Sequence, residues 1–334
     1  MQIRYPAYYR QFTCLAGACP DSCCHEWEVD VDPQATAFYR QLEGPLGDDL
    51  RQVLREGDDG WASMTITEDR RCPMWRRDGL CRIQAELGHD ALCATCREFP
   101  RLRHDYGDFV ELGLELSCPE AARLILSAPP QAMVTEVHPG DPEPDYDTRK
   151  MELLLASRSQ ALEILSDPSL APNHALAVLL LYGYAVQEAL DWEEAVDFSR
   201  ETAVTEAAAL AREGRLADIL ALYSELEILT DRWRGLLGSD PHPAAWAESH
   251  RSLARYFVER YWLQAISDGD LVCRVKFLIA SCLVIRGLGG RLEETAQLYS
   301  KEIENDADNV DALLDAAYTS PALADVKLLG LLLL

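Results

Sequence analysis

The second half of the chain has a helical spacing of apolar positions almost throughout. From residue 148 on, apolar residues recur three and four positions apart, as in DTRKMELLLASRSQALEIL and APNHALAVLLLYGYAVQEAL. Pro172 stands near the start of the second segment and Pro243 near the start of a third, HPAAWAESHRSLARYFVERYWLQAI. Proline is favoured there because the first turn of a helix leaves its N–H groups unpaired. The pattern predicts an α-helical bundle over residues 148–334.

Residues 1–128 lack a sustained apolar period and show short helical segments between irregular turns. Asp32 followed by Pro33 predicts one helix start, and Ser117 or Cys118 ahead of Pro119 predicts another. A metal site could supply the missing stability by cross-linking such a region. The expected fold class is therefore mainly α, with an irregular cysteine-rich metal-binding N-terminal domain followed by an α-helical bundle.

Prolines mark the junction between these two regions. The segment APPQAMVTEVHPGDPEPDYD contains Pro129, Pro130, Pro139, Pro142 and Pro144, which is typical of a linker or a long surface loop. The expected domains are a cysteine-rich metal- or cluster-binding domain at 1–128, a Pro-rich linker at 129–147 and an α-helical domain at 148–334.

Composition narrows the class of protein. The 334 residues have a formal net charge of -25, which argues against a nucleic-acid partner because phosphates would be repelled. The N-terminal MQIRYPAYYRQFTC lacks the apolar stretch of a signal peptide, and no run reaches the ~18 apolar residues of a membrane span. The C-terminal VKLLGLLLL is expected to end a core helix. We therefore expect a cytoplasmic protein without a membrane partner, in which clustered cysteines bind metal or do redox chemistry.

The eleven cysteines are unevenly placed. Cys273 and Cys282 lie in an apolar helical stretch and are expected to be small buried side chains. The other nine form Cys14-x4-Cys19-x3-Cys23-Cys24, then Cys72-x8-Cys81, Cys93-x2-Cys96 and a single Cys118. Zinc and iron–sulfur clusters prefer such thiolate ligands. Adjacent side chains converge poorly on one tetrahedral ion, so Cys23 and Cys24 favour a cluster or paired sites over a single zinc.

Arginines gather around the second group of cysteines. They are Arg70, Arg71, Arg76, Arg77, Arg82, Arg97, Arg101 and Arg103. Guanidinium groups could stabilise an anionic cluster nearby. The alternative is a solvated surface on which each arginine pairs with a neighbouring Asp or Glu.

Other candidate positions favour structural roles. His25 follows Cys24 and is expected to be a polar turn residue. Trp27, Trp61 and Trp75 are expected to pack the cysteine-rich core, although they could stack on a ligand. The segment ENDADNVDALLD lacks the glycine and acidic order of a calcium loop, so its aspartates predict a helix cap and a solvated face.

The N-terminal block resembles a known family. YPAYYRQFTC, HEWEVDVDPQATAFY, RCPMWRRDGLCRIQAELGHDALCATCREFPRL and LELSCPE are similar to elements of the flagellin lysine-N-methylases, and also to a wider group of zinc- or iron-chelating cysteine domains. The resemblance is dense from Tyr5 to Glu120. Eight cysteines fit the shared pattern: Cys14, Cys19, Cys23, Cys24, Cys72, Cys81, Cys96 and Cys118. Cys93 is an addition, and Phe99 stands where the family pattern has Tyr.

The resemblance implies a protein lysine N-methyltransferase that uses S-adenosylmethionine to modify flagellin. It also implies a [4Fe-4S] cluster, or alternatively zinc, held by those eight cysteines, with Cys19, Cys23, Cys81 and Cys96 ranked first. No glycine-rich strand-to-helix turn predicts the usual donor-binding fold. One possibility is that the cluster chelates the donor with help from Arg97 or Arg101. Two alternatives stay open: a non-enzymatic zinc or iron–sulfur module with a helical partner-binding domain, and a redox or electron-transfer protein.

Overall fold

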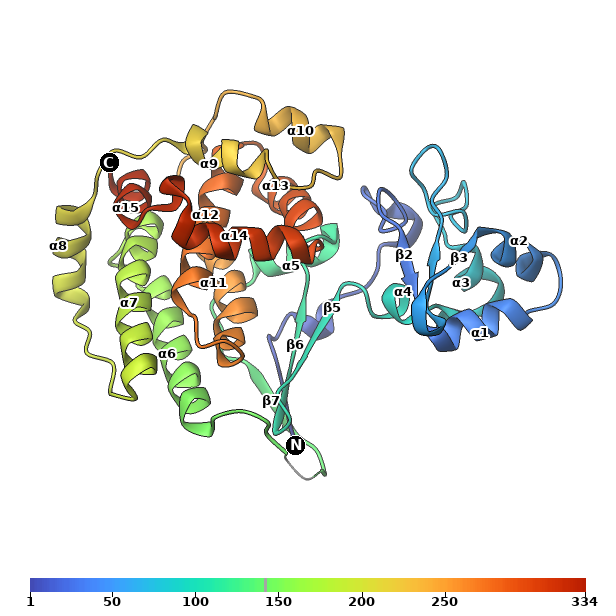
Figure 1. Cartoon of the computed structure of the whole chain (residues 1–334), viewed down its shortest axis with the longest axis horizontal. Coiled ribbons are helices and arrows are strands. Elements are labelled where there is room, and N and C mark those ends of the chain that lie inside the picture. Colours follow the sequence, from blue (N-terminus) through green and yellow to red (C-terminus); the bar gives the residue numbers. More distant parts are fainter. Residues whose placement is uncertain (141–142) are drawn as a thin grey trace.

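Helices dominate the computed structural model, which describes residues 1–140 and 143–334 (Figure 1). The prediction of a mainly α-helical chain is confirmed. The helical region comprises α5 (Pro119–Ser127), α6 (Thr148–Ser166), α7 (Pro172–Trp192), α8 (Arg200–Leu210), α9 (Leu216–Tyr223), α10 (Asp231–Leu237), α11 (Ser249–Tyr261), α12 (Val272–Gly287), α13 (Leu292–Tyr299), a π-helical turn (Ser300–Glu304), α14 (Ala307–Thr319) and α15 (Asp325–Leu333). Leu328, Leu329 and Leu332 are buried in α15, so the chain ends in a core helix as predicted, although Leu334 itself is exposed.

A small lobe, residues 29–98, stands apart from the helical region in Figure 1. It contains β2 (Val29–Val31), α1 (Pro33–Gln41), α2 (Pro45–Val53), β3 (Leu54–Glu56), β4 (Ala62–Met64), α3 (Arg82–Leu87) and α4 (Ala94–Glu98). Its three strands form one antiparallel sheet in the order β2-β4-β3. The predicted helix start is confirmed, because the Asp32 carboxylate accepts a hydrogen bond from the Ala35 N–H at 3.0 Å and Pro33 begins α1.

A second, four-stranded sheet joins the chain's first residues to its middle. Its order is β5 (Arg101–Asp105), β6 (Phe109–Leu114), β1 (Gln2–Tyr5) and β7 (Val134–Val137). β1 runs parallel to β6, with Ile3 opposite Val110, and antiparallel to β7. The sequence analysis did not predict this sheet, because strands of four to six residues carry little periodic signal.

Two separate hydrophobic cores follow from this arrangement. One lies within the small lobe and includes Val31, Tyr39 and Leu50. The other fills the helical region and also takes in Phe12 and the buried face of α5. Helix α5 therefore packs with the later helices. The division into domains at residues 128 and 147 stays a prediction; β7 lies inside the predicted linker, and residues 141 and 142 of that linker lie outside the described residues.

One predicted helix start is confirmed and another is wrong. Pro172 begins α7, as its position indicated. Pro243 does not begin α11, which starts at Ser249. The N–H groups of His242 and Ala244 instead bond the carbonyls of Gly287 and Arg286 at the end of α12. Those long-range hydrogen bonds hold the segment extended, so the helix forms only after it.

Three smaller predictions can also be compared with the structure. Cys273 and Cys282 are buried in α12, and Asp306 caps α14, as predicted. Trp61 does not pack the core, because 47% of it is exposed. No helix among the described residues combines the length and the apolar character needed to cross a membrane.

Candidate functional site

Seven of the predicted ligand cysteines line one cavity of about 350 Å³. We call it the thiol cavity; its cysteines are Cys14, Cys19, Cys23, Cys24, Cys81, Cys96 and Cys118. They come from four separate stretches of the chain, so the fold gathers thiols that the sequence spreads over a hundred residues. All eleven cysteines carry free thiols.

Cys72 and Cys93 lie outside this cavity. The Cys72 sulfur is 3.3 Å from the Met64 sulfur in the small-lobe core, and burial raises the pKa of Cys72 to about 12. Cys93 is also buried in that core, directly before α4. The assignment of metal ligands stays a prediction, but Cys72 is the one predicted ligand that the fold places apart from the others.

Two glycines allow the first cysteine group to approach the second. A Cβ on Gly17 would lie 2.6 Å from the Asp78 carbonyl oxygen, and one on Gly79 would lie 2.9 Å from the Gly17 Cα. Gly79 also has a φ of 79°, which favours glycine. The turn between Cys14 and Cys19 can therefore press against the turn that leads to Cys81.

Hydrogen bonds between thiols split their pKa values. A bond between the Cys23 and Cys24 side chains lowers the pKa of Cys24 and raises that of Cys23. A bond between Cys93 and Cys96 likewise lowers the pKa of Cys93 and raises that of Cys96. Of the two adjacent thiols, Cys24 is therefore the one whose ionised form is favoured.

Cations also reach the thiol cavity. Arg97, Arg101 and Lys301 line it, and the Arg101 guanidinium lies 5.1 Å from the centre of the Phe12 ring. Other arginines near the second group of cysteines pair with acids on the surface, for example Arg76 with Asp78 at 2.7 Å. Arg97 and Arg101 therefore line the thiol cavity, while the role of these arginines beside a cluster stays a prediction. The cavity combines soft sulfur ligands with positive charge, which suits an anionic group.

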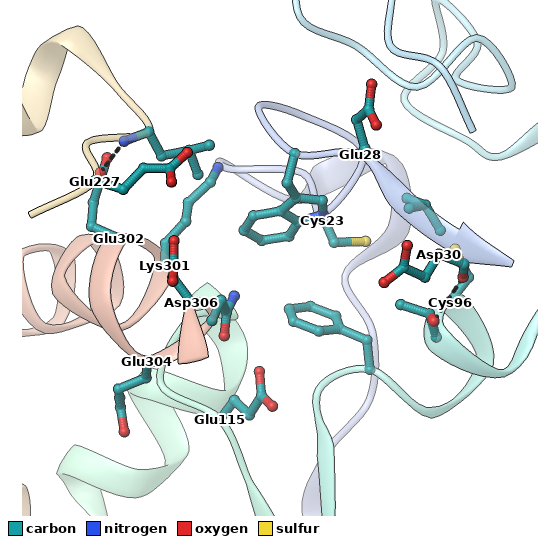
Figure 2. Close-up of a pocket in the computed structure, with 16 residues that line it drawn as sticks. Cys23, Glu28, Asp30, Cys96, Glu115, Glu227, Lys301, Glu302, Glu304 and Asp306 are labelled. Atoms are coloured by element: carbon teal, nitrogen blue, oxygen red, sulfur yellow. Dashed lines mark hydrogen bonds between the residues drawn. The ribbon is translucent and has the colours of Figure 1, made fainter. Parts of the chain in front are cut away.

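A second cavity, of about 500 Å³, has the opposite chemistry (Figure 2). We call it the acidic cavity because its lining includes Glu28, Asp30, Glu115, Glu227, Glu302, Glu304 and Asp306. It shares five lining residues with the thiol cavity: Cys23, Trp27, Cys96, Phe99 and Lys301. Figure 2 shows Lys301 and Glu302 on one side and Cys23, Asp30 and Cys96 on the other. The two cavities therefore adjoin along a wall of two thiols, two aromatic rings and one amine.

The π-helical turn supplies the acidic cavity's most buried carboxylates, Glu302 and Glu304. Glu304 accepts hydrogen bonds from the Tyr256 and Tyr261 hydroxyls at 3.0 and 2.9 Å and lies 3.3 Å from Arg260. Glu302 accepts from the Leu229 N–H at 2.7 Å and from the Thr230 hydroxyl. Such turns often occur at functional sites. No local sequence signal predicted these residues, because they meet the cysteine-rich region only through tertiary packing.

Glu115 forms fewer hydrogen bonds than Glu302 and Glu304 in the acidic cavity. It accepts a hydrogen bond from the Ser117 hydroxyl at 3.1 Å. Burial raises the pKa of Glu115, which makes its carboxylate a better proton acceptor than an ordinary glutamate. Glu115 is the carboxylate with the features expected of a general base.

The thiol cavity has the donor chemistry of a metal site but not its spacing. The sulfur set of the thiol cavity suits zinc or an iron–sulfur cluster. Within residues 1–140 and 143–334, no three His, Cys, Asp or Glu side chains are gathered closely enough to hold a metal ion. His25 stacks edge-on against Trp75 at 5.2 Å, and His89 lines the thiol cavity.

Known proteins resemble part of this chain. It is 32% identical over 139 residues to a protein named lysine-N-methylase from Salmonella typhimurium. This alignment covers 40% of this chain and 35% of that protein. It is 33% identical over 132 residues to the flagellar biosynthetic protein FliU of Salmonella muenchen, which is 38% of this chain and 78% of that protein. The match spans about a third of the length of the curated lysine-N-methylases. No protein-family model and no solved structure matches. The resemblance noted in the sequence is confirmed: the chain belongs to the family of the lysine-N-methylases and FliU.

Proposed function

We propose that this protein methylates lysine side chains of a protein substrate, with S-adenosylmethionine as the methyl donor and flagellin as the substrate. The observation that carries the proposal is the shared wall between the thiol cavity and the acidic cavity. One side suits an anionic cofactor and the other suits a cationic substrate. The names of the relatives support the same reaction and a flagellar substrate.

The thiol cavity would hold the cofactor. Its seven cysteines could ligate a [4Fe-4S] cluster or zinc, and Arg97, Arg101 and Lys301 would offset negative charge there. When bound, such a group supplies Lewis-acid contacts that could help to anchor the donor. The arginines are candidates to hold the donor's carboxylate by charge-assisted hydrogen bonds.

The acidic cavity would receive the substrate lysine. Carboxylates attract an ammonium group, and the faces of Trp27 and Phe99, whose ring centres lie 6.1 Å apart, add cation–π attraction. The amine must then lose its proton, since its ordinary pKa is about 10.4. Glu115 is the proposed proton acceptor. The nitrogen lone pair forms the N–CH3 bond as the donor's S–CH3 bond breaks, and the thioether leaves with that electron pair.

Mass analysis of the substrate tests the reaction. The anaerobically purified protein, after reconstitution with iron and sulfide, is incubated with S-adenosylmethionine and flagellin, and the intact mass of flagellin is measured. We expect stepwise mass gains of one methyl group each. If the cofactor loads but flagellin gains no mass, the methylase proposal is overturned and the non-enzymatic binding module is favoured.

Substitution of Glu115 tests the proposed base. Glu115→Gln should lower kcat by roughly 10²-fold, because a positioned general base contributes that much. It should also remove the acidic limb of the pH–rate profile. Glu225→Gln, an exposed residue outside the acidic cavity, is the matched control and should leave kcat unchanged. Equal rates in the two variants would exclude Glu115 as the base.

A further inference from the structure

Lys301 extends from the helical region to the wall between the two cavities. It lies in the π-helical turn, is only 4% exposed, and lines both the thiol cavity and the acidic cavity. Its ammonium nitrogen lies 4.9 Å from the centre of the Trp27 ring. Burying a lysine ammonium without an ion-pair partner lowers the stability of the fold. The residue that pairs with Lys301 therefore indicates the role of this lysine.

That partner is Asp21, in the loop that carries the first group of cysteines. The Lys301 nitrogen donates to both Asp21 carboxylate oxygens at 3.1 Å. Gln297, one turn earlier, donates to Asp21 at 2.8 Å and also to the carbonyl of Ser117 at 2.8 Å. Two residues from α13 and the π-helical turn therefore hold one carboxylate of this loop.

The loop is tied to the small lobe at its other end. The Cys24 carbonyl accepts a hydrogen bond from the Cys72 N–H at 2.8 Å. The Cys19 thiol lies 3.2 Å from the Asp21 carbonyl and is positioned to donate to it. Residues 19–24 thus bridge the small lobe and the helical region. Most of this bridge lines the thiol cavity, together with Ser117 and Cys118.

We propose that Lys301 is a positioning residue that acts through Asp21 to hold residues 19–24 in place, so that the thiol cavity is complete only when the helical region contacts this loop. The inference rests on the proposed function only in treating the thiol cavity as the cofactor site. It assigns the helical region a direct part in forming a site whose cysteines all lie in the first 118 residues. It also explains why a lysine is buried beside so many carboxylates.

Thiol labelling of the cofactor-free full-length chain tests this proposal. The variants are Lys301→Met and Asp21→Asn, alone and together, and the readout is the labelling rate of individual cysteines by mass spectrometry. Cys14, which is exposed, reports intrinsic reactivity, and Cys282, which is fully buried in α12, reports global unfolding. We expect Cys19 and Cys118 to label roughly tenfold faster in each variant, because losing a hydrogen bond to a charged group shifts a local equilibrium by about that factor. The double variant should label no faster than either single variant.

A buried lysine elsewhere provides the matched control. Lys276 in α12 is also 4% exposed and lies 3.2 Å from Asp325, and neither residue lines the thiol cavity. Lys276→Met should leave the labelling of Cys19 and Cys118 unchanged relative to Cys14. Equal labelling of Cys19 in the wild-type chain and in Lys301→Met would overturn the proposal.

Cofactor uptake gives a second readout that separates this inference from the proposed function. After reconstitution with iron and sulfide, Lys301→Met should bind several-fold less iron than the wild type, with a weaker visible absorbance. If the wild-type chain binds no iron, the cofactor proposal fails while the labelling result still decides the role of Lys301. Full iron uptake by Lys301→Met would contradict the positioning role.

Discussion

The helical region and the small lobe reach their stability by different means. The helical region surrounds a large apolar core and buries ion pairs, such as Arg158 with Glu111, whose side chains are 8% and 6% exposed. The small lobe has a much smaller core and short elements, and its ion pairs are open to water, as in Arg76–Asp78 at 44% and 46% exposure. Exposed ion pairs contribute little to the free energy of unfolding, whereas removing one partner of a buried pair lowers that free energy strongly.

The difference in core size between the two regions matters for the thiol cavity and the acidic cavity, because both regions line them. The small lobe and the loop before it supply most of the cysteines, while the helical region supplies Lys301, Glu302 and Glu304. The helical region, which has the large core, thus presents charged side chains to the cysteine-rich region, which has a much smaller one. Such a region gains most from a bound cofactor, because binding energy adds directly to its folding energy.

Breaking the buried pair should have the largest effect on this comparison. Arg158→Met leaves Glu111 buried without its two hydrogen bonds, at 2.7 and 2.6 Å, and should lower the free energy of unfolding by about 3–5 kcal/mol. Urea denaturation measures the change. The double variant Arg158→Met/Glu111→Leu should recover most of the loss, because no buried charge is left unpaired. A single variant as stable as the wild type would contradict this account.

Removing one hydroxyl should affect the small lobe alone. Tyr39 is fully buried and donates to the Ala91 carbonyl at 2.7 Å. Tyr39→Phe leaves that carbonyl unpaired and should cost about 1 kcal/mol. Hydrogen exchange should accelerate in residues 29–98 while α11 and α12 stay protected. The control Tyr318→Phe removes an exposed hydroxyl from the helical region and should change neither the stability nor the hydrogen exchange of the small lobe. If Tyr39→Phe instead accelerates exchange equally in both regions, the two regions unfold together.

Acidification should have the smallest effect, with opposite signs in the two regions. Burial raises the pKa of Glu259 and of Glu302, so the folded helical region binds these protons more tightly than the unfolded chain and gains stability as pH falls towards the ordinary glutamate pKa of about 4.3. In the small lobe, burial raises the pKa of Asp32, but hydrogen bonds from the Ala94 and Ala35 N–H groups outweigh it and the net pKa is lowered. That contribution is present above the ordinary aspartate pKa and is lost as pH falls through the folded value.

Hydrogen exchange at a series of acidic pH values, corrected for intrinsic rates, measures this contrast. The small lobe should lose protection before α11 does. Asp32→Asn should flatten the response of the small lobe, and Glu259→Gln should flatten that of α11. If both regions lose protection in parallel as pH falls, titratable groups other than Asp32, Glu259 and Glu302 determine the pH dependence of stability.

Most of the local structure could be predicted from the sequence. The three-to-four spacing of apolar residues predicted the helices after residue 148, and Asp32–Pro33 and Pro172 marked helix starts correctly. These features depend on hydrogen bonds and side chains within a few residues of each other, so they can be read from a short window. The clustering of cysteines also pointed to the region that lines the thiol cavity.

Which of those residues meet follows from the packing of the whole chain. It placed Cys72 in the small-lobe core and the other predicted ligands around one cavity. It brought Lys301 to Asp21 across 280 positions of sequence and set the carboxylates of the π-helical turn beside the same wall. It also kept Pro243 out of a helix through hydrogen bonds to the end of α12. Contacts between distant segments arise from packing the whole chain, and no local pattern of residues encodes them.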